Sequence, residues 1–128
     1  HSYGHIMLLE EEKKWLFSGD QISAHNIWHF QGNDVQAPFR STLHSLKELA
    51  LKVTEDYKIY PAHDIIPIQK NYLTDLIDCF EWELQENYKK DEPFHSFAGD
   101  GYQHFYQTVN LIYSDERLGE FLGRKIER

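Results

Sequence analysis

Two stretches with helical periodicity alternate with short apolar runs, and this order constrains the fold more than any other feature of the sequence. Apolar residues recur at helical spacing over residues 41–53 and again over residues 68–90. Short apolar runs occupy residues 4–9, 14–18 and 58–60, and polar or turn-forming residues bound each of them. Helices that alternate with strands are typical of layered domains, so we predict an α/β fold.

The first two apolar runs predict a β-hairpin. The charged residues 10–13 join the run over residues 4–9 to the run over residues 14–18, and Gly19 and Asp20 end the second run. Apolar residues are nearly continuous in both runs instead of alternating with polar residues. Continuous apolar strands are typical of strands buried on both faces, so we expect both faces of this hairpin to be covered.

The segments outside these elements are less regular. Residues 21–40 have neither helical nor strand periodicity, which predicts a long loop of the kind that usually has a function. Ser41 is expected to cap the first helix. We expect a loop over residues 94–101, and residues 101–113 fit either a strand or a helix. Asp115 is expected to cap a final short helix.

Composition excludes several classes of protein. The 128 residues include 21 acidic and 13 basic side chains, for a formal net charge of −8, which argues against a nucleic-acid partner. No apolar run approaches the roughly 18–20 residues of a membrane span, and no signal peptide is evident. The single cysteine, Cys79, excludes an internal disulfide and fits a buried thiol in a reducing, cytoplasmic setting.

Three polar residues at strand ends are candidate metal ligands. His1 precedes the first predicted strand, Asp20 ends the second and His63 follows the third. Ligand sites collect at strand ends in layered α/β sheets, and an imidazole–carboxylate ligand set suits Zn, Mn or Fe. The structural alternative is that Asp20 caps a turn and that His63 is a histidine hydrogen-bonded at a strand end.

Four motifs in this region resemble a known superfamily. Residues 1–5 (HSYGH), 16–20 (LFSGD), 45–49 (SLKEL) and 59–64 (IYPAHD) occur in the order and at the separations found in the metallo-β-lactamase fold superfamily. The resemblance covers residues 1–66. It implies an αββα sandwich and a metal-dependent hydrolase.

The resemblance also implies a metal site with two ions, usually zinc, with iron or manganese as possibilities. His1 matches a ligand of the first metal, Asp20 matches the carboxylate that bridges both metals, and His63 matches the last histidine, on the second metal. His5 matches a position that supports the ligands or lies beside the substrate. Paired metals polarise the group under attack and lower the pKa of bound water.

The H-x-H-x-D-H motif of this superfamily is absent from the sequence. The resemblance therefore implies that residues 1–66 are the C-terminal half of the metallo-β-lactamase-like domain. Residues 67–128 are then a helical, pocket-shaping extension of the same domain. Three ligands cannot build a two-metal centre unaided, so we expect an N-terminal half, or a second copy of the chain, as a partner. The chain alone is expected to be inactive.

Substrate contacts are expected from the loop over residues 21–40. Trp28, His29 and Phe30 fit an apolar wall with one polar group, which suits a small organic substrate. The alternative is that these aromatic residues only attach the loop to the domain. His104 lies outside the resemblance, and we expect it to serve packing.

The function predicted from the sequence is hydrolysis of a small-molecule ester, lactone or thioester by metal-activated water. One alternative is a di-iron redox relative of the same fold. Another is a non-catalytic association unit. No membrane partner is expected.

Overall fold

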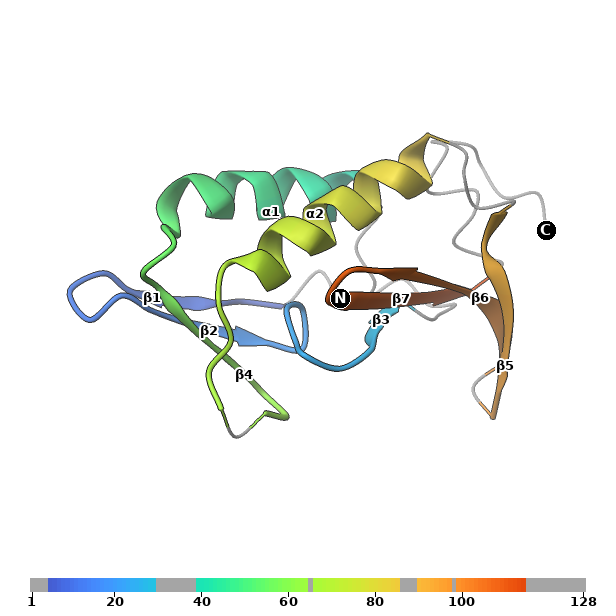
Figure 1. Cartoon of the computed structure of the whole chain (residues 1–128), viewed down its shortest axis with the longest axis horizontal. Coiled ribbons are helices and arrows are strands. Elements are labelled where there is room, and N and C mark those ends of the chain that lie inside the picture. The colour runs from blue at the N-terminus through green and yellow to red at the C-terminus, as the bar shows by residue number, and fades with distance from the viewer. Residues whose placement is uncertain (1–4, 30–38, 65, 86–89, 98, 115–128) are drawn as a thin grey trace.

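The computed structural model has two helices and two small β-sheets in its described part, which confirms the predicted α/β class (Figure 1). The structure describes residues 5–29, 39–64, 66–85, 90–97 and 99–114. His1, Phe30 and the predicted final helix after Asp115 lie outside these ranges. No helix in the described ranges is long and apolar enough to cross a membrane.

The first sheet contains the predicted hairpin. Strands β1 (Leu8–Glu10) and β2 (Trp15–Gly19) pair in antiparallel fashion, and β4 (Lys58–Pro61) pairs with β2 in parallel. The sheet order is β1-β2-β4. The parallel partner is possible because helix α1 (Phe39–Lys52) carries the chain back across the sheet.

The prediction that the hairpin is buried on both faces is wrong. In β2, Leu16 and Ser18 are buried whereas Phe17 is 42% exposed, and Leu8 in β1 is 62% exposed. One face of the sheet packs against the helices, and the outer face carries apolar side chains with no cover in the described part of the chain. A continuous apolar run therefore reflects one covered face and one uncovered apolar face.

The second sheet has the order β3-β7-β6-β5. It consists of β3 (Ile27–His29), β5 (Glu92–Ser96), β6 (Gly99–Tyr106) and β7 (Val109–Ser114). The predicted loop over residues 94–101 is therefore wrong, and residues 101–113 form two strands joined by a turn at residues 107–108. The predicted loop over residues 21–40 contains β3, because this short segment pairs in parallel with β7 at the other end of the chain.

Both helices lie on the same side of the two sheets (Figure 1). Helix α1 begins two residues before the predicted cap Ser41, because Phe39 is fully buried. Helix α2 (Asn71–Leu84) is shorter than the predicted stretch 68–90. Ile68 instead exchanges two backbone hydrogen bonds of 2.8 Å with Ile59 of β4, which holds it in extended conformation.

One core joins all of these elements. Leu16 and Ile59 of the first sheet, Phe80 of α2, and Leu111 and Tyr113 of β7 belong to the same buried cluster. The segment after residue 66 thus packs on the core of the first half, but beyond α2 its described part is β-sheet instead of the predicted helices. Cys79 is buried in this core, as predicted, and burial raises the pKa of its thiol.

Gly101 tests the pairing of β6 with β7. A Cβ at this position would lie 2.1 Å from the carbonyl oxygen of Tyr113, and backbone cannot yield as a flexible side chain can. We predict that Gly101→Ala lowers the free energy of unfolding by about 1–3 kcal/mol, as overpacking does. Urea denaturation measures the change. Gln103→Ala, on the same strand, should cost less than about 1 kcal/mol. Equal stabilities of wild type and Gly101→Ala would contradict the pairing.

Candidate functional site

The parallel pairing of β2 with β4 brings together two of the three predicted metal ligands. Asp20 follows β2 directly and His63 follows β4 after one intervening residue. The Nε2 atom of His63 lies 2.8 Å from Oδ1 of Asp20, although the two residues are distant in sequence. The Asp20 side chain is 42% exposed and the His63 side chain 74%. The predicted convergence is confirmed for this pair, and their metal-binding role stays a prediction.

Gly19 shapes the strand end that presents Asp20. Its φ of +60° lies in the left-handed region that glycine tolerates best. The register of β2 against β4 shifts between Phe17 and Gly19, and the Gly19 carbonyl accepts a 3.1 Å hydrogen bond from the amide of Ala62. This bulge ends the regular pairing and turns the chain so that Asp20 lies beside His63.

His5 lies against the same strand end. Its Nε2 is 3.0 Å from the carbonyl oxygen of Ser18. A Cβ at Gly19 would lie only 2.6 Å from Cε1 of His5, so the imidazole occupies the space that the glycine leaves open. His5 therefore packs on the residue next to Asp20, a placement compatible with its predicted supporting role.

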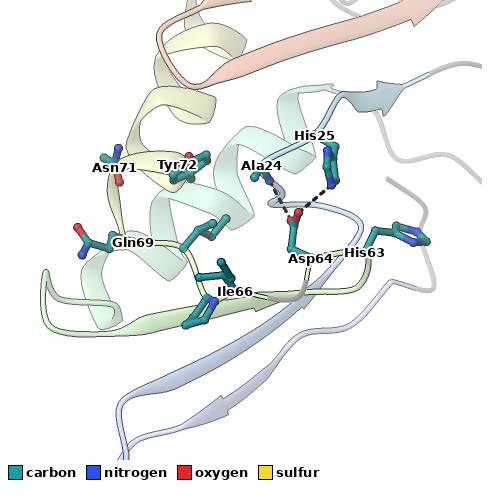
Figure 2. A pocket seen from close by; sticks show the side chains of 10 residues that line it. Ala24, His25, His63, Asp64, Ile66, Gln69, Asn71 and Tyr72 are labelled. Atoms are coloured by element: carbon teal, nitrogen blue, oxygen red, sulfur yellow. Dashed lines mark hydrogen bonds and ion pairs between the residues drawn. The ribbon is translucent and has the colours of Figure 1, made fainter.

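A second histidine–carboxylate pair adjoins the first and was not predicted. Nε2 of His25 lies 2.8 Å from Oδ1 of Asp64, the residue after His63. Asp64 also accepts a hydrogen bond of 3.2 Å from the amide of Ala24 (Figure 2). The hydroxyl of Ser23 donates a further one, of 3.3 Å, to Asp64. The only sequence signal was the His–Asp dipeptide after β4, since His25 lies in a segment without periodicity.

Two adjoining cavities open at these pairs. The smaller has a volume of about 370 Å³ and is lined by Asp20, Ser23, His25, Asn26, Trp28 and His63. The larger, of about 680 Å³, extends from His25 and His63 past Asp64 to the start of α2 (Figure 2). His25 and His63 line both cavities, whereas Asp20 lines only the smaller one and Asp64 only the larger one. Imidazole and carboxylate groups can bind a metal, hold a proton or accept a hydrogen bond.

The three predicted substrate-wall residues have different placements. Trp28 lines the smaller cavity and packs edge-on against Phe94 at 5.5 Å. His29 does not belong to that wall. Its side chain is fully buried, edge-on to Phe39 at 4.9 Å and to Phe80 at 5.2 Å, because β3 alternates and turns it into the core. Phe30 lies outside the described residues.

Comparison with known proteins gave no relative. No family model, no curated protein and no solved structure matches the chain. The resemblance to the metallo-β-lactamase superfamily therefore rests on the four sequence motifs alone, and membership remains a prediction.

Gly19 also generates a test of the site's geometry. We predict that Gly19→Ala lowers the free energy of unfolding by about 1–2 kcal/mol, since a side chain at positive φ is strained and the new methyl group would overlap His5. Thermal and urea denaturation measure the loss. The double-mutant cycle with His5→Ala separates the two causes, because the smaller neighbour relieves only the overlap. Unchanged stability in Gly19→Ala would show that the turn does not need glycine.

Proposed function

We propose that this chain contributes Asp20 and His63 to the metal centre of a hydrolase that acts on a small-molecule ester, lactone or thioester. The observation that supports the proposal most is the 2.8 Å contact between these two side chains at neighbouring strand ends. The motif resemblance implies this proximity, because Asp20 and His63 both match ligands of the same metal. Zinc is the metal that the resemblance favours, and the same donors also suit iron or manganese.

The donor atoms of this pair fit a divalent metal. One carboxylate oxygen and one imidazole nitrogen face each other at the wall of the smaller cavity, and both side chains are accessible to solvent. Without a metal, the same two atoms pair with each other. A bound zinc ion would supply a polarising charge and would lower the pKa of bound water.

Neighbouring residues have separate roles in this proposal. Asp64 orients the imidazole of His25 toward the cavities, and the pair can accept or hold a proton beside the substrate. Trp28 provides an apolar surface against which the organic part of a small substrate can pack. The net charge of −8 favours a small substrate over a nucleic acid.

Asp20 and His63 are too few to hold a metal centre alone, so the proposal requires further ligands. We assign one to His1, as the motif resemblance implies. The others would come from a polypeptide segment with the H-x-H-x-D-H motif, which this sequence lacks. In the αββα arrangement, that segment belongs to a second sheet packed on the first.

The outer face of the first sheet supports such a second layer. Leu8, Phe17 and Tyr60 lie directly across from one another in the strand register and point away from the helices. Phe17 stacks on Tyr60 at 5.5 Å, and Trp15 packs edge-on against both rings. An exposed row of large apolar side chains is typical of a surface that another element covers.

The same face also supports a second candidate, a non-catalytic association unit. The two candidates share the outer face and differ in what Asp20 does. In the association unit, Asp20 only accepts a hydrogen bond at a strand end. In the hydrolase, its carboxylate is indispensable for activity.

We predict that Asp20→Asn abolishes hydrolysis by the complete assembly, that is, this chain together with the polypeptide that supplies the other ligands. The substitution keeps the shape of the side chain and removes its negative charge. His5→Ala should cost about 10–100-fold, as loss of a group that supports metal ligands does. Turnover of lactone, thioester and ester substrates in the presence of zinc measures both.

The matched control is Asp56→Asn, which removes the exposed partner of Lys14 far from the site. Its activity should equal that of the wild type. Full activity in Asp20→Asn would rule out the hydrolase proposal. An assembly that hydrolyses none of the three substrate classes, with Asp20→Asn still assembling normally, would favour the association unit.

The outer face predicts the behaviour of the chain by itself. We expect it to self-associate at micromolar concentrations, because Leu8, Phe17 and Tyr60 lack a covering layer in its described part. Phe17→Ser should shift sedimentation toward the monomer, whereas Leu51→Ser, on the exposed side of α1, should not. A monodisperse wild-type monomer with a cooperative thermal transition would contradict the need for a second layer.

A further inference from the structure

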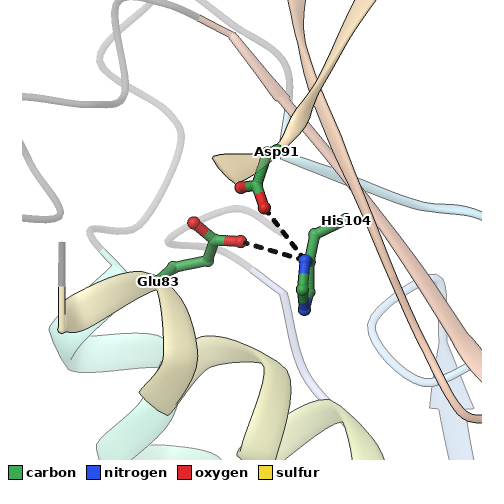
Figure 3. Close-up of side chains that lie close together, drawn as sticks. All are labelled: Glu83, Asp91 and His104. Carbon is green, nitrogen blue, oxygen red and sulfur yellow. Dashed lines mark hydrogen bonds and ion pairs between the residues drawn. The ribbon is translucent and has the colours of Figure 1, made fainter. Parts of the chain in front are cut away.

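A buried group of three potential ligands lies between the end of α2 and the second sheet. Glu83 comes from the last turn of α2, Asp91 precedes β5 and His104 lies on β6 (Figure 3). One ligand atom from each lies within 4.8 Å of the other two. Glu83 is fully buried, and the side chains of Asp91 and His104 are 1% and 15% exposed.

Two carboxyl groups that are buried side by side require a nearby positive charge if both are to ionise. Nδ1 of His104 lies 2.9 Å from Oδ1 of Asp91 and 4.0 Å from Oε1 of Glu83. Among the described residues, His104 is the only basic side chain in ion-pair contact with either carboxyl group. One basic side chain can balance at most one carboxylate, so a second carboxylate would have no positive partner among the described residues.

Glu83 is the carboxyl group with the more distant positive partner, since His104 lies nearer to Asp91. Its Oε1 is buried and receives no hydrogen bond from the described residues. Burial, together with the hydrogen bond and the charge of the neighbouring Asp91, raises the pKa of Glu83 to about 9. Burial also opposes ionisation of Asp91, but hydrogen bonds from His104, Glu83 and Tyr113 leave its pKa below the usual value.

We infer that Glu83, Asp91 and His104 bind a divalent transition-metal ion such as Zn²⁺. Two carboxylate oxygens and one imidazole nitrogen form a ligand set that zinc accepts. The ion would lie among the three ligand atoms and would give the buried Oε1 of Glu83 a positively charged partner.

The surroundings favour a structural role for this ion. The Tyr113 hydroxyl donates a hydrogen bond to Asp91 and lies 3.3 Å from Oε2 of Glu83, so it contacts both carboxyl groups. Trp82 stacks on the imidazole of His104 with ring centroids 5.3 Å apart. A site this buried leaves little room for a substrate, and its three ligands join the end of α2 to two parts of the second sheet.

The experiment is calorimetric titration of the metal-free full chain with Zn²⁺, together with thermal denaturation with and without zinc. The inference predicts one zinc ion bound per chain at this site and a higher melting temperature in its presence. Glu83→Gln and His104→Gln should each weaken binding at least about tenfold, since each removes one of three ligands.

Matched controls on the same elements should leave binding unchanged. Glu81→Gln makes the same change on the exposed face of α2, and His95→Gln makes it on the exposed β5. Asp20→Asn separates this site from the candidate hydrolase centre. Absence of zinc binding, or binding that Asp20→Asn removes and Glu83→Gln preserves, would overturn the inference.

If Glu83→Gln fails to fold, Asp91→Asn tests the same ligand set. This variant should fold, because the Asn side chain still accepts the hydrogen bond from Tyr113. A measurement on the wild type needs no substitution. Zinc should shift the Nδ1 resonance of His104 in nitrogen-15 NMR spectra of the imidazole groups, and an unshifted resonance at saturating zinc would overturn the inference.

Discussion

The parallel pairing of β2 with β4 is the interaction on which the rest of this structure depends. Leu16 and Ile59 face each other in this pairing, and both are fully buried beneath the helices. The pairing requires the chain between the strands to cross the sheet, which places α1 on the core. It also brings both strand ends to the same edge, where Asp20 and His63 meet. The fold and the candidate site thus have a common physical origin.

In the part of the chain that the structure describes, the helices cover only one side of the sheets. The molecule therefore has a covered face and an uncovered face. On the covered side, α2 packs against α1 and against β6 and β7 of the second sheet, and its last turn delivers Glu83 to His104. On the other side, Phe17 and Tyr60 form an exposed aromatic surface. The proposed metal centre lies at the edge of the uncovered face. The hydrolase proposal therefore requires a further layer of polypeptide on this face.

Local periodicity predicted the elements that have an apolar pattern of their own, namely the hairpin, the two helices and β4. It did not predict β3, because a three-residue strand such as Ile27–His29 is defined by its distant partner β7. The apolar pattern of the hairpin also could not distinguish a strand face that is covered from an apolar face that is exposed. Motif resemblance identified Asp20 and His63, whose contact follows from strand order. The group around Glu83 was missed because only the pairing of β5 with β6 brings Asp91 to His104.

The most direct test of the central claim is an anomalous difference map at the zinc absorption edge, from crystals of the complete assembly grown with zinc. The account predicts a peak about 2 Å from a carboxylate oxygen of Asp20 and from a nitrogen of His63, with those two side chains no longer paired directly. An intact ion pair between Asp20 and His63, with no anomalous peak beside it in a zinc-saturated assembly, would contradict the claim that these strand ends form a metal site.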